Sequence, residues 1–181
     1  MLLANPGNAR HVVKGSAARS ILGDLSTTPS DTKVVLVAGD EDKLVTDKTA
    51  LEILGGLCHI PRNQRDLLIF HSDHNEAWAV TAGHGAPGAP DPRYDFGDDG
   101  AKVVGSIGPG EWPAKSKSMN NLDIYGYWKL LDSLVDATIH GSSPDAALGG
   151  GRRQRFMGLW PDGKPLKEAT VADDPCVPAV L

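Results

Sequence analysis

The pattern of hydrophobic and polar residues predicts two buried β-strands joined by a helix. Residues 33–38 and 66–70 each consist of one charged residue followed by an unbroken apolar run, which is typical of central parallel strands covered on both faces. Between them, residues 47–54 place apolar side chains at helical spacing, and Gly55 and Gly56 end the predicted helix. The order strand, helix, strand is one βαβ unit, so the sequence predicts an α/β fold with a parallel sheet and helices on its faces.

The C-terminal part of the chain adds a long amphipathic helix and a hairpin. Residues 122–139 carry an apolar stripe that we expect to face the core; it consists of Ile124, Trp128, Leu131, Val135 and Thr138 or Ile139, widened by Tyr127 and Leu134. Pro161-Asp-Gly is a turn sequence, because Pro fixes φ and Gly accepts positive φ. It predicts a hairpin between residues 155–160 and 165–171.

Residues 83–121 are rich in Gly and Pro and predict a long loop region, with a short strand at 101–104. A loop of this length in a compact domain is usually functional, and we expect it to line the mouth of a substrate site. Apart from this loop, the 181 residues predict one domain, residues 1–181.

Composition narrows the partners and the compartment. The net charge of -5 argues against nucleic acid. The chain contains no run of about eighteen apolar residues, so the sequence predicts no membrane span. The N-terminus also lacks a signal-peptide pattern. Cys58 and Cys176 form no metal or redox motif. We therefore expect free thiols, a reducing compartment and a cytoplasmic protein.

Candidate chemistry follows the two predicted strands. Asp42 comes just after the first strand, and His71 and His74 come just after the second. Catalytic groups of open α/β sheets gather at the carboxyl ends of the strands. A carboxylate there can hold one imidazole tautomer, and that imidazole can accept a proton from a hydroxyl nucleophile.

These residues resemble the α/β-hydrolase superfamily. Val-Val-Leu-Val-Ala-Gly-Asp-Glu-Asp-Lys-Leu-Val, residues 34–45, is similar to the strand and acid loop of that family, which implies Asp42 as the triad acid. Phe70-His-Ser-Asp-His-Asn is similar to the exit of the histidine strand and implies His74. Ala82-Gly-His-Gly-Ala-Pro also resembles a histidine segment of such enzymes, so His84 competes with His74. Residues 122–129 and 154–160 resemble the C-terminal region of a group of these hydrolases.

The nucleophile is the departure from the family pattern. In this family serine precedes the acid and the histidine, usually on a Gly-x-Ser-x-Gly elbow. Only 41 residues precede Asp42, too few for the strands and the elbow, since one βαβ unit takes about thirty residues. None of the serines has glycine at both flanking positions: Ser16, Ser20, Ser26, Ser30 and Ser106. We expect the C-terminal portion of a longer hydrolase, or a chain that needs a partner for the front half of its sheet.

The resemblance implies hydrolysis of a small-molecule ester or similar acyl bond, without a cofactor. An incomplete sheet would also expose an edge that favours self-association. Two rival hypotheses remain. One is a metal-binding hydrolase, because ligand-type side chains crowd into a short stretch: His71, Asp73, His74 and His84. The other is a non-catalytic binding module, which the missing nucleophile favours.

Overall fold

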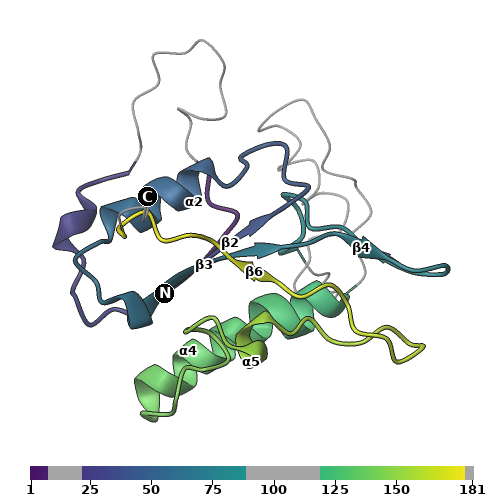
Figure 1. Cartoon of the computed structure of the whole chain (residues 1–181). Helices are drawn as coiled ribbons and strands as arrows, with labels where there is room; N and C mark the ends of the chain where they lie inside the picture. Colours follow the sequence, from purple (N-terminus) through teal and green to yellow (C-terminus); the bar gives the residue numbers. More distant parts are fainter. Residues whose placement is uncertain (8–21, 89–118, 178–181) are drawn as a thin grey trace, which may run out of the picture.

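The two apolar runs form the centre of a four-stranded sheet (Figure 1). A computed structural model of the chain describes residues 1–7, 22–88 and 119–177. The strand order is β1-β2-β3-β6. β1 (Leu2–Ala4), β2 (Val34–Gly39) and β3 (Arg65–Phe70) are parallel, and β6 (Thr170–Val171) pairs with β3 antiparallel. The prediction of an α/β fold with a mainly parallel sheet is confirmed.

The remaining elements are short, apart from two helices. The order along the chain is η1 (Leu25–Thr27), α2 (Lys48–Gly56), η2 (Arg62–Gln64), β4 (Asp73–His74), β5 (Ala79–Val80), η3 (Leu122–Trp128), α4 (Lys129–Ile139) and α5 (Arg152–Arg155). The helix predicted at 47–54 and the strands predicted at 33–38 and 66–70 agree with α2, β2 and β3 within two residues. Residues 101–104 and most of the 83–121 loop region lie outside the described residues. None of the described helices has the length and hydropathy needed to cross a bilayer.

Helices cover both faces of the sheet and divide the core in two. Because neighbouring residues of a strand point to opposite faces, Val34, Leu36 and Ala38 pack with α2. Val35 and Val37 pack instead with η3 and α4 on the other face. In Figure 1, α2 lies above the sheet and α4 and α5 lie below it. This layering explains why β2 is apolar at every position.

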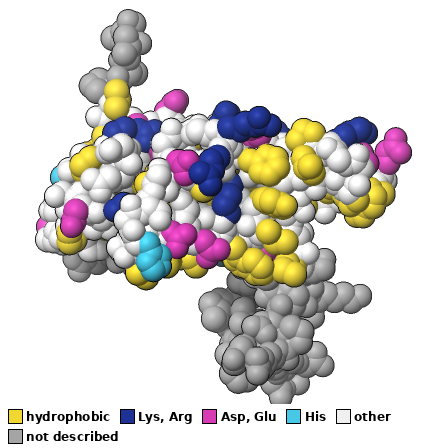
Figure 2. Space-filling view, turned by 90° about the horizontal axis from the view of Figure 1, so that it is seen from below, with side chains coloured by type: hydrophobic (Ala, Val, Ile, Leu, Met, Phe, Trp, Pro, Cys, Tyr) yellow, Lys and Arg dark blue, Asp and Glu magenta, His cyan; other side chains and the backbone are white. Residues whose placement is uncertain are grey.

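The predicted orientation of the long helix is wrong. The stripe expected in the core is exposed: Ile124 is 43% exposed, Trp128 45%, Leu131 46%, Val135 42% and Ile139 68%. Of the predicted stripe, the two widening residues Tyr127 and Leu134 are buried, together with Leu122, Leu130 and Ala137, which were not predicted. Figure 2, which views the molecule from the side of α4, shows hydrophobic side chains gathered on this face.

Two local features select the buried face. Residues 122–128 form a π-helical segment, whose wider turns shift the later residues around the axis relative to a uniform α-helix. Gly126 brings the helix close to β3, because a Cβ at this position would lie 2.5 Å from Cε2 of Phe70. Tyr127 then packs against Phe70 with their ring centroids 5.0 Å apart. Neither feature is visible in the 3.6-residue periodicity.

The predicted C-terminal hairpin is present in reduced form. Its ladder contains one isolated antiparallel bridge, between Leu159 and Pro165. The Pro-Asp-Gly turn closes by hydrogen bonds from Trp160 N to Lys164 O (2.8 Å) and from Gly163 N to Trp160 O (2.8 Å). The chain then continues into β6, which attaches this segment to the sheet.

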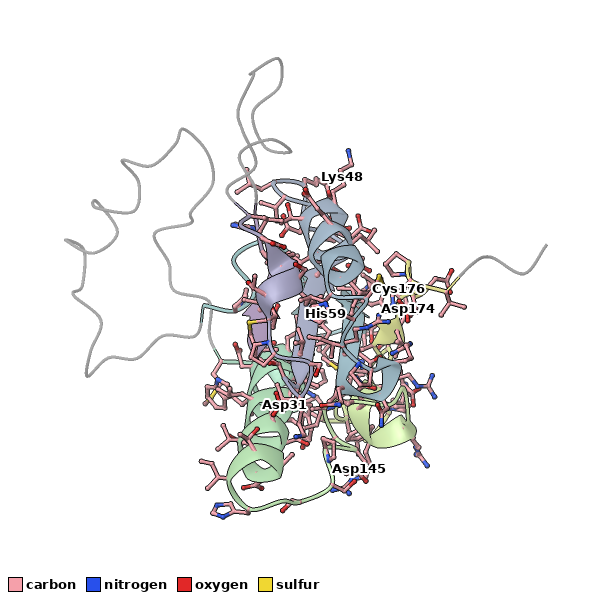
Figure 3. The ribbon with its side chains drawn as sticks, turned by 90° about the vertical axis from the view of Figure 1, so that its left-hand side faces the viewer. Asp31, Lys48, His59, Asp145, Asp174 and Cys176 are labelled. Atoms are coloured by element: carbon pink, nitrogen blue, oxygen red, sulfur yellow. A yellow bond between two sulfur atoms is a disulfide. The ribbon has the colours of Figure 1, made fainter. Side chains whose placement is uncertain are left out.

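The expectation of free thiols is wrong. Cys58, just after α2, forms a disulfide with Cys176, and their Cα atoms are 5.5 Å apart. The same tail carries Asp174, whose carboxylate contacts Arg65 Nη1 at 2.7 Å and Arg62 Nε at 3.2 Å. Burial alone would raise the pKa of Asp174, but hydrogen bonding and the charges of Arg65 and Arg62 lower it overall. Figure 3 shows Asp174 and Cys176 side by side next to α2. The C-terminal tail is therefore fastened to the sheet and to α2 at two neighbouring points.

The disulfide closes a long loop, so its removal should cost stability. The two cysteines are 118 residues apart, and cross-links over long loops restrict the unfolded chain most strongly. We expect the double variant Cys58→Ser, Cys176→Ser to lose about 2–4 kcal/mol of unfolding free energy. Urea denaturation of the oxidised protein, of the reduced protein and of the variant measures this. An unchanged midpoint after reduction would contradict the pairing.

Lys129 predicts a pH-dependent stability. Its Nζ donates to Gln154 O (2.9 Å) and Phe156 O (2.7 Å), and burial lowers its pKa to about 8. Between that value and the unfolded pKa of about 10.4, unfolding takes up a proton, so this group makes the unfolding free energy rise with pH. Below pH 8 the lysine is protonated in both states and contributes no slope. Denaturation midpoints at pH 7 to 10 should rise more in the native protein than in Lys129→Met, and equal slopes would refute the assignment.

Candidate functional site

Asp42 and His84 form a hydrogen-bonded pair at the carboxyl end of the sheet. Oδ2 of Asp42 lies 2.9 Å from Nδ1 of His84. The side chain of Asp42 is completely buried, and that of His84 is 28% exposed. A buried carboxylate thus holds one edge of a ring that also reaches the surface.

The turn after β2 places the carboxylate. Asp42 N donates to Gly39 O (3.1 Å), which closes the turn. Oδ1 of Asp42 then accepts from Leu44 N and Val45 N, each at 3.0 Å. Since a buried charge needs hydrogen-bond donors to replace water, these two amides and the ring of His84 compensate the carboxylate and fix its orientation.

The segment at residues 82–84 crosses the end of β2 and brings the histidine to the acid. Ala82 O accepts from Glu41 N (3.1 Å). Gly39 permits this approach, because a Cβ at Gly39 would lie 2.0 Å from Ala82 O. On the other side, Nδ2 of Asn5 donates to Gly83 O (3.0 Å) and His84 O (3.2 Å). Oγ of Ser72, just after β3, accepts from Ala82 N (3.0 Å). Residues that follow β1, β2 and β3 therefore all hold this segment.

A second aspartate–histidine pair lies beside the first. Asp40 Oδ2 is 3.0 Å from His71 Nδ1, and the other ring nitrogen of His71 is 2.8 Å from Thr170 Oγ1. Burial alone would raise the pKa of Asp40, but hydrogen bonds from Ser72 and His71 lower it overall. Both ring nitrogens of His71 are engaged, so this pair ties the end of β3 to β6 and to the acid loop.

His74 lies apart from the acid. It sits on β4, which pairs with β5, and it is exposed. Both carboxylate oxygens of Asp42 are bonded elsewhere, and no hydrogen bond joins His74 to Asp42 within the described chain. Of the two histidines left open by the sequence, the structure brings His84 to Asp42 and does not bring His74.

The expected metal ligands are not assembled. His71 and His84 bind different aspartates, and Asp73 Oδ2 accepts from Lys167 N (2.9 Å). Across residues 1–7, 22–88 and 119–177, no three side chains of His, Cys, Asp or Glu come together in a way that could hold a metal ion.

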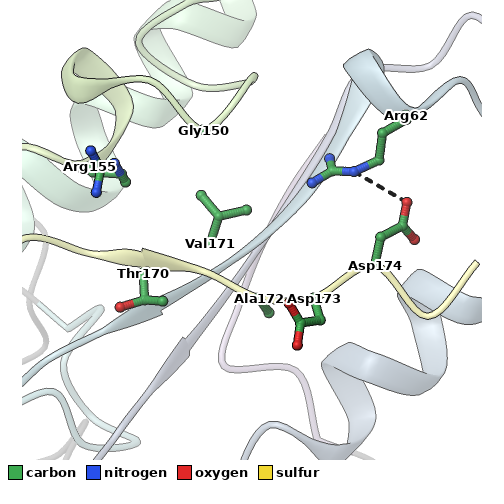
Figure 4. A pocket seen from close by; sticks show the side chains of 8 residues that line it. All are labelled: Arg62, Gly150, Arg155, Thr170, Val171, Ala172, Asp173 and Asp174. Carbon is green, nitrogen blue, oxygen red and sulfur yellow. Dashed lines mark ion pairs between the residues drawn. The ribbon is translucent and has the colours of Figure 1, made fainter. Parts of the chain in front are cut away.

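Two open pockets mark the surface. One has a volume of about 510 Å³ and is lined by Asp40, Glu41, Ser72, Asp73, His74, Ala79, Val80 and Thr81. The other has a volume of about 490 Å³ and lies between η2, α5 and β6, where Arg62 and Asp174 form an ion pair (Figure 4). The lining of the first pocket includes the two residues that precede Asp42 in the chain, Asp40 and Glu41, but neither member of the Asp42–His84 pair.

Tyr127 lies behind the pair and was not predicted as part of it. Burial and the nearby charges of Asp123 and Asp42 raise its pKa, so the hydroxyl stays protonated at any ordinary pH. Asn5 was missed as well, because its contacts with residues 83 and 84 span almost 80 positions. No local sequence pattern around Tyr127 or Asn5 predicts a position beside the Asp42–His84 pair.

The two candidate serines within the described residues, Ser26 and Ser30, do not enter the site. Ser26 is exposed and its Oγ donates to Asp24 Oδ1 (2.6 Å), and Ser30 is exposed before β2. Ser16, Ser20 and Ser106 lie outside the described residues.

The close approach at Gly39 gives a direct test of how the site is held. Gly39→Ala should destabilise the protein by about 1–3 kcal/mol, the usual cost of overpacking a buried position, because its Cβ meets a backbone oxygen rather than a movable side chain. Gly23→Ala is the matched control, since nothing lies within 4 Å of its new Cβ. Thermal denaturation of both variants measures the difference. A Gly39→Ala protein as stable as Gly23→Ala would disprove the contact.

Comparison of the chain with protein-family models, with curated proteins and with solved structures finds no match.

Proposed function

We propose that this chain carries the acid and the histidine of a serine-type hydrolase that cleaves an ester or similar acyl bond. The hydrogen bond between Asp42 Oδ2 and His84 Nδ1 supports this proposal most strongly. The pair has the arrangement that such catalysis needs: a buried, fixed carboxylate and a ring that it orients.

In this proposal each residue has one task. Asp42 keeps the Nδ1 proton of His84 in place and stabilises the imidazolium that forms during the reaction. His84 accepts the proton of a hydroxyl nucleophile through Nε2 and then donates it to the leaving alcohol. Asp42 does not itself take up the proton. We place the acyl group in the pocket lined by Glu41 and His74, because Glu41 directly precedes the acid in the chain.

The nucleophile comes from a polypeptide segment beside β1. Within the described sheet β1 is an outer strand. Met1 O accepts from Val35 N (2.9 Å) and Asn5 N donates to Val37 O (2.8 Å), so the backbone groups of Leu2 and Ala4 point to the other side. A parallel segment on that side would end near His84. We infer that this segment belongs to a longer form of the chain or to a partner.

The cysteines bear on the cellular compartment in which the protein works. The cytoplasmic location remains a prediction from the sequence. A disulfide such as Cys58–Cys176 favours an oxidising environment instead, because disulfides persist there and are rare in a reducing cytosol.

A fluorophosphonate probe tests the proposal, because it labels a serine only when a base activates it. The probe is applied to the protein as its source cells produce it, together with any longer chain segment or bound partner. We expect mass spectrometry to find one labelled serine in that segment or partner, with labelling at least about a hundredfold slower in His84→Ala, as expected when a general base is lost. His140→Ala is the matched control and should label normally, since His140 is exposed at the end of α4 and does not line this pocket. An intact assembly that takes up no label, or one whose labelling does not depend on His84, would refute catalysis by this pair and favour a non-catalytic binding module.

A further inference from the structure

Asn5 occupies an unusual position behind the Asp42–His84 pair. It directly follows β1, is 5% exposed, and has a φ of +45°. Non-glycine residues rarely adopt positive φ, and asparagine tolerates it better than most. Its backbone N–H donates to Val37 O, which fastens the residue to β2. A buried amide is thus held in a demanding backbone conformation at the end of the sheet.

The side-chain amide of Asn5 donates two hydrogen bonds to the segment that carries His84. Nδ2 donates to Gly83 O (3.0 Å) and to His84 O (3.2 Å). The two residues are 79 positions apart, so the contact is entirely tertiary. The turn after β2 contributes the bond from Glu41 N to Ala82 O, two residues before the histidine, and Oγ of Ser72 accepts from Ala82 N (3.0 Å). Asn5 donates to the backbone of His84 itself.

We propose that Asn5 is a positioning residue for His84: its amide fixes the backbone at residues 83–84 so that the imidazole meets Asp42. The proposal refines the proposed function at the same site. Asn5 does not touch substrate and acts only through His84.

The chemistry at this position requires an amide. Two carbonyl oxygens converge on one atom, so that atom has to carry two donor hydrogens. Aspartate has the same shape but would set a carboxylate against both oxygens. Glycine would accept the positive φ but would remove the amide donor, so that Gly83 O would keep its bond from Ala86 N (3.0 Å) and the part-buried His84 O would lose the bond from Asn5, which is costly. Either substitution should loosen residues 83–84 while leaving β1 and β2 in place.

The test reads the hydrogen bond directly by NMR, without any catalysis. A ring N–H held by a carboxylate gives a separate low-field proton signal, and His84→Ala identifies the one that belongs to His84. In Asn5→Gly and Asn5→Asp we expect exchange of this proton with solvent to become roughly tenfold to a hundredfold faster, which corresponds to the loss of two hydrogen bonds. The signal of His71 with Asp40 serves as an internal reference and should not change.

Asn121→Ala is the matched control. Asn121 Nδ2 also donates to two backbone carbonyls, Leu159 O (3.1 Å) and Met157 O (3.4 Å), but away from the Asp42–His84 pair. This variant should lose stability and still keep the His84 signal.

Three results would overturn the proposal. An unchanged His84 exchange rate in both Asn5 variants would show that other contacts suffice. Equal acceleration for His84 and His71 would show a general loosening of the protein. Failure of both Asn5 variants to fold, with Asn121→Ala folded, would make Asn5 a residue of the fold rather than of the site. If the NMR result holds but no serine is labelled by fluorophosphonate, the positioning role stands and the hydrolase proposal falls.

Discussion

The buried carboxylate of Asp42 is the constraint around which the sheet end is organised. An ionised carboxylate removed from water is tolerable only if donors replace the lost hydration. Two of these donors are the amides of Leu44 and Val45 in the turn of Asp42 itself, and the third is the ring of His84, which is distant in the sequence. The local turn alone provides no hydrogen-bond donor to Oδ2 of Asp42. The residue 82–84 segment is therefore needed to complete the environment of the acid, and the acid in turn gives that segment a defined end point.

The central part of the fold was predictable because its sequence allows few alternatives. Unbroken apolar runs such as residues 34–38 can only be buried on both faces, and the intervening helix then forces a parallel pairing. Asp42 was predictable for the same reason, since it directly follows such a strand. The choice between His74 and His84 was not. Both follow β3 within fourteen residues, and the selection depends on Gly39 and Asn5, which are distant in sequence and mark no pattern.

The prediction of the buried face of the long helix failed for a different reason. It has two apolar faces, and a hydrophobic stripe does not say which face meets the sheet. The decision lies in Gly126, which lets Phe70 approach, and in the π-helical segment that rotates the following residues. The cysteines illustrate the same limit. A contact across 118 residues depends on where the tail lies, and the Arg65–Asp174 ion pair that guides the tail is also long-range.

The two edges of the described sheet differ in a way that matters for the site. At one edge, β6 closes β3, and the disulfide and the arginines fasten the tail behind it. At the other edge no described strand pairs with β1, and the next residue, Asn5, holds the His84 segment through its side-chain amide. Asp42 and His84 are thus joined to each other and to the residue after β1, while the tail fastened by the disulfide lies at the opposite edge. In the proposed reaction this arrangement would orient the base before the nucleophile binds, so that the nucleophile would not have to organise it.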